Sequence, residues 1–370
     1  MRDEIEILQR KAAGESGVIG MGGGLPSPRQ FPRRALVRAL TDAVFQASPP
    51  ALQYAWPEGS DDLRARIAEY MTARGAGVEP DRILVTSGAQ QALMVASQVL
   101  CPRGSRIFTD PETYPGALEL FRTRGIDPIP FPEGTDLTAS DACAAYVMPV
   151  VSNPRGLTMS EEARRSLLES GLPILEDDAY GDLRFDGPGP RPLLPEAPDR
   201  VFFIGTFSKT LAPGLRVGWL IPPERLLEDA TRVKKDVDLQ ANGLGQAIVE
   251  HFLRNEGYTK QLVRLRSFYR RRAKKLAAAV RRELPGWRFD FPEGGFALWL
   301  EAPEPDCAGG ELGLLEAAIE EGLSFDPGSS FRPDGSPRPL AVRLCFSALE
   351  PDELAEGAKR LARAWRRVSS

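Results

Sequence analysis

The chain has 370 residues, 42% of them hydrophobic, which suffices for a sizeable core and indicates two domains or one large domain with a smaller lobe. The formal net charge of −4, from 47 basic and 51 acidic residues, gives no general attraction to nucleic acid or to anionic membranes. The four cysteines form no C-x-x-C pair and His251 is the one histidine, which argues against a disulfide framework, a metal site and a Ser-His-Asp triad. The charged N-terminus is unlike a signal peptide, and no apolar run approaches the roughly 18 residues of a membrane span, so we expect a cytoplasmic protein.

Short apolar runs alternate with helical patterns through the first two thirds of the chain. One helical pattern places Leu63, Ile67, Tyr70 and Met71 on one face, and a second occupies Ala89–Leu100. Runs that are short and continuously apolar are typical of buried strands in a mostly parallel sheet, with ligands at the C-terminal ends of the strands. The predicted strands are Ile83–Thr86, Arg106–Thr109, Ala145–Val150, Pro173–Leu175, Val201–Ile204 and Val217–Ile221.

The pattern changes from about Tyr258 onward. Val263–Arg282 reads as a long helix, Phe291–Leu300 and Ala341–Phe346 as strands, and a last helix begins at Pro351. These elements predict a separate α+β lobe. We divide the chain into an N-terminal arm that belongs to the small lobe (1–40), a large domain (41–260) and the small C-terminal lobe (261–370).

A lysine motif follows one of the predicted strands. Thr206-Phe207-Ser208-Lys209 is followed by Pro213-Gly214-Leu215-Arg216-Val217-Gly218. A lysine at a strand end can be partly desolvated, which favours the neutral amine that forms imines. Thr206, Ser208 and Arg216 offer hydroxyl donors and a guanidinium fork to a phosphate group. A lone lysine is usually an exposed surface residue, so the inference depends on the motifs around it.

Three further turns carry polar groups near predicted strand ends. Ser87, Gly88, Ala89 and Gln90 lie where a strand passes into a helix, so their backbone N–H groups can bind an anion. Leu175-Glu176-Asp177-Asp178-Ala179-Tyr180-Gly181 places acidic residues at a strand end, and Ser152-Asn153-Pro154-Arg155-Gly156 is a turn motif. Each pattern alone also fits an ordinary turn or cap.

The segment Thr206–Trp219 resembles the lysine signature of the fold-type I, class I/II aminotransferases, and most resembles the subgroup of 2-aminoadipate and kynurenine aminotransferases. The resemblance runs from about Gly20 to Ser347, with the motifs in the family's order. It implies an α/β protein of the PLP-transferase fold type I, whose large domain has a mostly parallel seven-stranded sheet flanked by helices. It also implies pyridoxal 5'-phosphate (PLP) as the cofactor and an active site shared between two chains of a homodimer.

The resemblance assigns roles to residues of the lysine, acidic and asparagine motifs. Lys209 would hold the cofactor as a Schiff base and act as the general base. Asp177 would pair with the pyridine nitrogen, with Asp178 as a competitor one residue out of phase. Tyr180 and Asn153 would bind the ring oxygen. Arg155 departs from the usual N-P-T-G form of the motif at its variable third position.

The remaining roles concern the phosphate, the ring face and the substrate. Thr206, Ser208, Arg216 and the turn 87–90 would bind the phosphate, together with Tyr54 of the neighbouring subunit. Tyr114 would stack on the pyridine ring. The substrate would contact Gly24 in the N-terminal arm, Asn153, and Arg343, whose guanidinium would bind the α-carboxylate.

The expected reaction is a ping-pong transfer of an amino group between an L-amino acid and a 2-oxo acid. The same scaffold also supports elimination, cyclisation or oxidation of amino acids, which the resemblance leaves open. A ligand-sensing domain of the MocR regulator type is a further alternative, but we expect no DNA-binding module because the pattern begins near Gly20. Leu25 follows Gly24 where an arginine could have paired with an acidic substrate, and the sequence does not identify the substrate.

Overall fold

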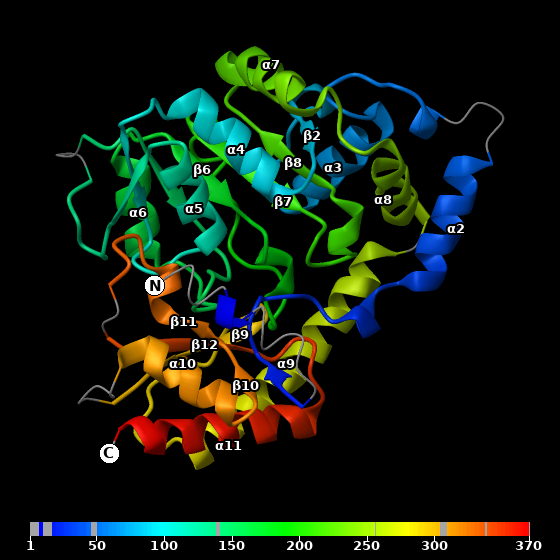
Figure 1. Cartoon of the computed structure of the whole chain (residues 1–370). Coiled ribbons are helices and arrows are strands. Elements are labelled where there is room, and N and C mark those ends of the chain that lie inside the picture. Colours follow the sequence, from blue (N-terminus) through cyan, green and yellow to red (C-terminus); the bar gives the residue numbers. More distant parts are fainter. Residues whose placement is uncertain are drawn as a thin grey trace.

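A computed structural model describes residues 7–9, 17–45, 50–137, 141–255, 257–303, 309–336 and 339–369. Its large domain contains a seven-stranded sheet in the order β2-β8-β7-β6-β5-β3-β4 (Figure 1). β8 is antiparallel to both of its neighbours, and the other pairs are parallel. The predicted mostly parallel sheet is therefore confirmed. The strands are β2 (Leu84–Thr86), β3 (Arg106–Thr109), β4 (Asp127–Pro130), β5 (Ala144–Val147), β6 (Ile174–Asp177), β7 (Val201–Thr206) and β8 (Gly218–Ile221).

One strand of this sheet was missing from the predicted set, and another was predicted too long. The edge strand β4 has the sequence Asp-Pro-Ile-Pro, which gives no apolar run, and proline is tolerated at an edge because one side of the strand needs no N–H donors. β5 ends at Val147, so the prediction that it extends to Val150 was wrong.

Helices cover both faces of the large sheet. Side chains alternate along each strand, so Tyr146 of β5 faces one hydrophobic cluster while Ala145 and Val147 face the other. The first cluster includes α4 (Ala89–Leu100), α5 (Pro115–Thr123), α7 (Leu227–Asp238) and much of the small lobe. The second includes α3 (Asp61–Ala73), α6 (Glu161–Glu169) and α8 (Gly243–Asn255).

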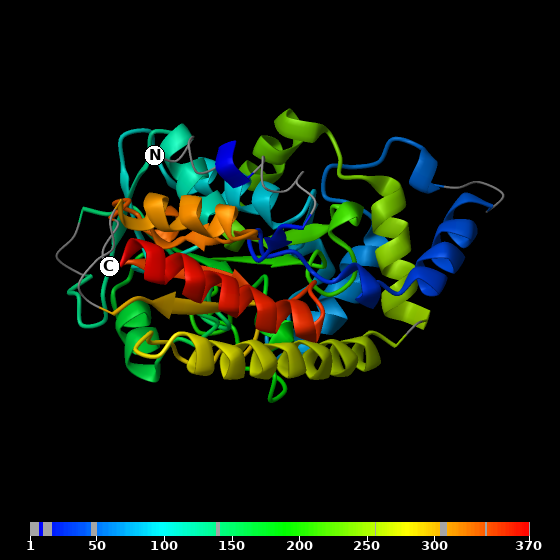
Figure 2. The same ribbon diagram turned by 60° about the horizontal axis from the view of Figure 1, so that its bottom comes forward.

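The small lobe contains a three-stranded antiparallel sheet in the order β11-β12-β9. These strands are β11 (Asp326–Pro327), β12 (Ala341–Cys345) and β9 (Ala297–Glu301). The predicted strand Phe291–Leu300 therefore began too early, because Gly294 and Gly295 interrupt it. In the lobe, α11 (Pro351–Val368) contacts both α9 (Tyr258–Glu283) and α10 (Gly310–Glu320), and the three helices run alongside one another in Figure 2.

The N-terminal arm contacts both parts of the molecule. Its strand β1 (Ile19–Gly20) pairs in parallel with β10 (Leu323–Ser324) of the small lobe. α2 (Arg33–Val44) then packs on α8, where His251 Nδ1 lies 3.2 Å from Asp42 Oδ2. Short 3-10 helices lie at Pro28–Gln30, Pro50–Leu52, Pro80–Arg82, Gly181–Leu183, Pro213–Leu215, Glu224–Leu226 and Gly328–Phe331.

The domain boundaries at residues 40 and 260 stay our division of the chain, and they fall inside α2 and α9. Within the described ranges, no helix combines the length and the apolar composition needed to cross a membrane.

Candidate active site

The predicted site residues follow strands that end at one edge of the large sheet. Ser87 comes directly after β2, Asp177 is the last residue of β6, and Lys209 lies three residues after β7. Because these strands are parallel, their carboxyl ends meet at the same edge. β8 runs the other way, so Arg216, which precedes it, reaches that edge from the start of its strand.

Lys209 is half-buried in a turn that its neighbours fix. The Thr206 hydroxyl accepts a hydrogen bond from the backbone N–H of Ser208 at 3.1 Å. Lys209 Nζ donates to the carbonyl oxygen of Gly24 at 3.4 Å and lies 5.4 Å from the centroid of the Tyr180 ring. The arm residue Gly24 and the strand-end lysine are therefore in direct contact.

The two acidic residues after β6 have different partners. Asp177 accepts hydrogen bonds from the Tyr146 hydroxyl at 2.8 Å and from the backbone N–H of Ala179 at 3.1 Å. Burial raises the pKa of Asp177 to about 6, although the hydrogen bond from Tyr146 opposes the shift. Asp178 instead forms a buried ion pair with Arg74 of α3.

The turn after β2, Ser87–Gln90, lies against Arg216, and we call these residues the cradle. Gly88 precedes α4 with a φ of 84°, and Arg216 Nη2 donates to the carbonyl oxygen of Ser87 at 2.8 Å. Glycine is favoured at position 88 because φ is positive, and a Cβ there would also lie 2.8 Å from Arg216 Nη2. Gly218 pairs with Thr86 on one side and Thr206 on the other, and a Cβ there would lie 2.9 Å from the Cα of Gly88.

The other first-turn residues of α4 complete the cradle. Ala89 and Gln90 begin the helix, where N–H groups and the helix dipole favour an anion. The Gln90 side chain donates to the carbonyl oxygen of Gly116 at 3.0 Å, which joins α4 to α5. Ser87 Oγ lies 3.3 Å from Asp238 Oδ2, and that carboxylate is paired with the buried ammonium of Lys234 at 3.1 Å.

A buried arginine lies on the small-lobe side of the site. Arg343 of β12 donates from Nη1 to Asn153 Oδ1 at 2.7 Å, so the structure joins these two predicted substrate residues. A cavity of about 10 Å³ is lined by residues that include Gly24, Asn153, Tyr180 and Arg343. Tyr180 is buried and packs edge-on against Phe296 at 5.3 Å.

Tyr114 lies close to the same charged groups. Burial raises the pKa of its hydroxyl; the charges of Asp177 and Tyr180 add to this rise, and those of Arg216 and Arg343 oppose it. A Cβ on Gly116 would lie 2.4 Å from the Tyr114 ring and hydroxyl. Glycine at position 116 therefore makes room for this aromatic ring.

The sequence matches the family described as aminotransferase class I and II over residues 18–361. The chain belongs to this family. A 2-aminoadipate transaminase of Thermus thermophilus is 34% identical over 98% of this chain and 93% of its own length. The crystal structure of the alpha-aminoadipate aminotransferase LysN from the same species, complexed with N-(5'-phosphopyridoxyl)-L-leucine, has a TM-score of 0.86 at 33% identity, covering 97% of this chain and 94% of that one. A Pyrococcus horikoshii kynurenine aminotransferase has a TM-score of 0.91 at 29% identity, covering 98% and 94%.

The protein is thus a PLP-dependent transaminase with the type I fold, acting on an amino acid and a 2-oxo acid. Its described residues fit the cofactor chemically. The cradle of Gly88 and Arg216 suits a phosphate dianion, a buried carboxylate at Asp177 suits a pyridinium nitrogen, and Lys209 supplies an amine. Among the described residues, no group of three or more His, Cys, Asp or Glu side chains is arranged to hold a metal ion.

One predicted residue of the aminotransferase stands apart from the others. The Tyr54 side chain is 82% exposed. None of the contacts described for the chain joins it to Lys209, Arg216 or the turn after β2. The prediction that Tyr54 reaches the cofactor of a neighbouring subunit therefore stays a prediction.

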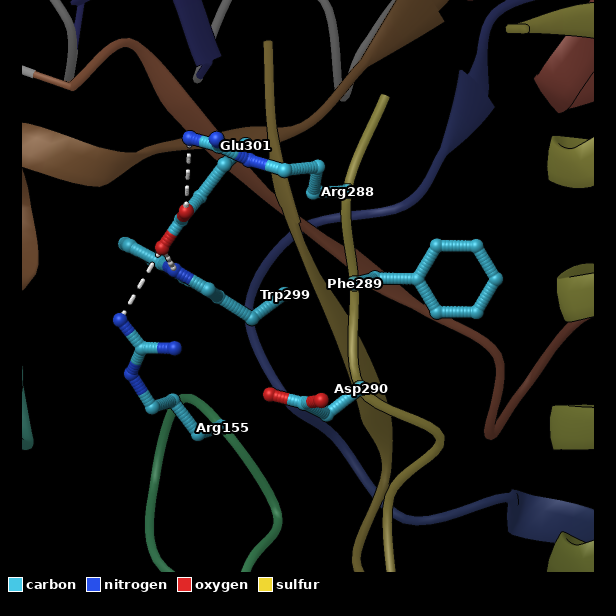
Figure 3. A pocket seen from close by; sticks show the side chains of 6 residues that line it. All are labelled: Arg155, Arg288, Phe289, Asp290, Trp299 and Glu301. Carbon is cyan, nitrogen blue, oxygen red and sulfur yellow. Dashed lines mark hydrogen bonds and ion pairs between the residues drawn. The ribbon is translucent and has the colours of Figure 1, made fainter. Parts of the chain in front are cut away.

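Arg155 gives the aminotransferase a charged link between its two lobes. Its Nε lies 3.0 Å from Glu112 of the large domain, and its Nη2 lies 3.0 Å from Glu301 of β9. Figure 3 shows Arg155 and Arg288 reaching toward Glu301 from two sides of a cavity of about 260 Å³, beside the Trp299 ring. This contact gives a structural role to the residue that departs from the N-P-T-G motif.

Sequence reasoning missed several residues that position the predicted ones. Tyr146 lies within a predicted strand, where its place in an apolar run does not indicate a hydrogen bond to Asp177. Asp326 lies 2.6 Å from Arg343, and an acid beside the buried Phe325 was the signal that could have indicated it. Arg74 gave no signal because its partner Asp178 is distant in the sequence, and Gly116 gave none because a glycine after a proline is also typical of an ordinary turn.

Proposed function

We propose that this aminotransferase works by a ping-pong mechanism in which Lys209 both binds the cofactor and transfers the substrate proton. When bound, PLP supplies an aldehyde that condenses with amines and a ring that withdraws electrons from the substrate Cα. The single observation that carries the proposal is the position of Lys209 Nζ, between Gly24 of the arm and the Tyr180 ring at the edge where the sheet strands end.

Lys209 is the proposed general base because its amine lies beside Gly24 and Tyr180, among the predicted site residues. The amine can accept the proton from the substrate Cα and donate it again later in the transfer of the amino group. The one histidine, His251, lies next to Asp42 between α8 and α2, in contact with a different set of residues. The chain therefore offers a lysine rather than an imidazole for this proton transfer.

The proposed roles of the remaining residues follow from their surroundings. Asp177 would pair with the ring nitrogen, because Asp178 is already paired with Arg74. Tyr180 and Asn153 would donate to the ring oxygen, and Tyr114 would cover one face of the ring. Arg216, Thr206, Ser208 and the turn Ser87-Gly88-Ala89-Gln90 would bind the phosphate.

Arg343 and the arm are proposed to bind the substrate. The guanidinium would bind the α-carboxylate through paired N–H donors, and Gly24 would cover it from the arm. Relatives named for 2-aminoadipate and kynurenine support a substrate class of larger amino acids, including aromatic ones. Leu25 is 63% exposed beside Gly24 and offers no charge to an acidic side chain.

We also propose a homodimer in which Tyr54 completes the partner's site. The exposed apolar side chains Phe45, Leu52, Tyr54 and Trp56 lie in one stretch of the large domain, which is typical of a surface that another chain covers. A cytoplasmic location is proposed from the free thiols of Cys101, Cys143 and Cys345, since reducing compartments keep cysteines unpaired. Cys307 lies outside the described residues.

The visible absorption of the purified holoenzyme tests the reaction. We expect an amino acid to bleach the cofactor band and a 2-oxo acid to restore it, with one new amino acid formed per oxo acid consumed. Release of ammonia or hydrogen peroxide without an acceptor would instead indicate the alternative, an elimination or oxidation on the same scaffold.

A further inference from the structure

Asp326 is the direct cross-strand neighbour of Arg343 in the small lobe. β11 and β12 pair these two residues in register. Asp326 Oδ2 accepts hydrogen bonds from Arg343 Nε at 3.0 Å and from Nη2 at 2.6 Å. The two side chains are only 13% and 8% exposed, so the carboxylate neutralises a guanidinium that would otherwise be buried with an unbalanced charge.

The same carboxylate also binds the N-terminal arm. The backbone N–H of Gly23 donates to Asp326 Oδ1 at 3.2 Å and to Oδ2 at 3.0 Å, and the Gln9 side chain donates to Oδ1 at 3.2 Å. Gly22 passes so near that a Cβ there would lie 2.9 Å from Asp326 Oδ1. One side chain therefore fixes both Arg343 and the arm segment that leads to Gly24.

The contacts of Arg343 define which part of its guanidinium is left for a ligand. Asp326 occupies Nε and one N–H of Nη2, and Asn153 occupies one N–H of Nη1. Each terminal nitrogen carries two N–H groups, so Nη1 and Nη2 each keep one that these contacts do not use, and a carboxylate can accept from both nitrogens. A Cβ on Gly24 would lie 3.4 Å from both terminal nitrogens, so the arm passes directly over this fork.

We propose that Asp326 is a positioning residue for substrate recognition: it orients the Arg343 fork toward the substrate α-carboxylate and holds the N-terminal arm over it. The inference deepens the proposed function, because it rests on Arg343 as the carboxylate ligand. It contrasts with simple competition, in which Asp326 would occupy Arg343 at the substrate's expense and its removal would strengthen carboxylate binding.

Two stable adducts separate carboxylate binding from catalysis. N-(5'-phosphopyridoxyl)-L-leucine carries an α-carboxylate, whereas N-(5'-phosphopyridoxyl)-3-methylbutylamine is the same adduct without it. Calorimetry with the full-length chain, freed of cofactor, gives a dissociation constant for each adduct. The ratio is the dissociation constant of the amine adduct divided by that of the leucine adduct, and it measures what the carboxylate contributes to binding. We expect the wild-type chain to bind the leucine adduct more tightly.

Three substitutions then test Asp326. Asp326→Val should reduce the ratio at least about tenfold, because a displaced fork binds poorly, and leave binding of the amine adduct within about threefold. Gly22→Ala, whose methyl displaces the carboxylate without removing its charge, should reduce the ratio in the same direction. Asp326→Asn keeps one oxygen acceptor but loses the negative charge and the second acceptor, so its ratio should fall between those of wild type and Asp326→Val. Asp334→Val, an exposed acid of the same lobe, is the matched control.

The outcomes distinguish the inference from the function on which it rests. A ratio that is unchanged or increased in both Asp326→Val and Gly22→Ala overturns the positioning role. An unchanged ratio in Arg343→Gln overturns Arg343 as the carboxylate ligand and with it the substrate-binding proposal. If Asp326→Val does not fold, as judged by circular dichroism, a ratio that is unchanged or increased in both Gly22→Ala and Asp326→Asn overturns the positioning role.

Discussion

The Tyr146 hydroxyl of β5 donates a 2.8 Å hydrogen bond to the Asp177 carboxylate at the end of the neighbouring strand β6. A carboxylate held in this way keeps one orientation, which a ring nitrogen needs if it is to pair with it. We expect Asp177→Asn to lower the transamination rate by about 10²–10³ through the loss of this charge. Tyr146→Phe should lower the rate by about 10- to 100-fold, since a hydrogen bond to a charged group contributes about 1.5–3 kcal/mol. Steady-state kinetics of both variants checks this, and equal rates for Asp177→Asn and wild type would contradict it.

The neighbouring Asp178 should give the opposite phenotype. Its ion pair with Arg74 is buried, and removal of one partner leaves an uncompensated charge that costs about 3–5 kcal/mol. Asp178→Asn should therefore lower the free energy of unfolding while the rate per folded molecule stays within a few fold. Urea unfolding alongside active-site titration measures both quantities. A fully stable but inactive Asp178→Asn protein would make Asp178, rather than Asp177, the cofactor's partner.

Glu176 should make stability depend on pH. Burial raises the pKa of this carboxyl to about 8, despite hydrogen bonds from the backbone N–H groups of Leu193 and Leu194. The folded chain thus keeps a proton that the unfolded chain, with a pKa of about 4.3, has lost. Its contribution to stability is present below about pH 4.3 and is lost as pH rises toward 8. Between pH 5 and pH 8, the free energy of unfolding in urea should fall less steeply with pH for Glu176→Gln than for wild type. Equal slopes would show that Glu176 does not keep its proton in the folded chain.

Hybrid enzymes test the shared site. A Tyr54→Ala chain keeps Lys209, and a Lys209→Ala chain keeps Tyr54. If each site combines Lys209 of one chain with Tyr54 of the other, a mixed dimer has one intact site and one doubly defective site. Mixed dimers, purified after co-expression through two different affinity tags, should have about half of the wild-type activity per dimer. Each parent variant alone should have much less. Mixed dimers no more active than the parents would show that Tyr54 acts within its own chain or not at all.

Arg155 should stabilise the contact between the lobes. Its side chain is 35% exposed, so solvent screens its pairs with Glu112 and Glu301, and Arg155→Thr should cost only about 1 kcal/mol of unfolding free energy. Arg288→Gln is the control, because that side chain is 72% exposed and lies 3.6 Å from Glu301. Chemical unfolding should give a lower free energy of unfolding for Arg155→Thr than for Arg288→Gln. The reverse order would show that Arg155 does not stabilise the contact between the lobes.

The sequence predicted those elements whose structure follows from a local pattern of residues. The apolar runs around Ile107, Leu175 and Phe203 predicted buried strands, because a strand covered on both faces needs no polar alternation. The strand order and the reversed direction of β8 did not follow, since periodicity says nothing about which strands are neighbours. Lys209, Gly24 and Arg343 were predicted from their motifs, while the contacts of Lys209 with Gly24 and of Arg343 with Asp326 depend on how the arm and the small lobe fold back.

Gly218 is the shared partner of Thr86 and Thr206, and a consequence for natural variation follows from it. The chain between Thr206 and Gly218 leaves β7, places Lys209 and Arg216 at the edge of the sheet, and returns so that Gly218 of β8 pairs with Thr206 of β7. One residue gained or lost there would turn every side chain of β8 to the opposite face or pull Arg216 away from the turn at Gly88. Across the aminotransferases that share this arrangement, we expect insertions or deletions in this loop to be rarer than substitutions at its positions other than Ser208, Lys209 and Arg216.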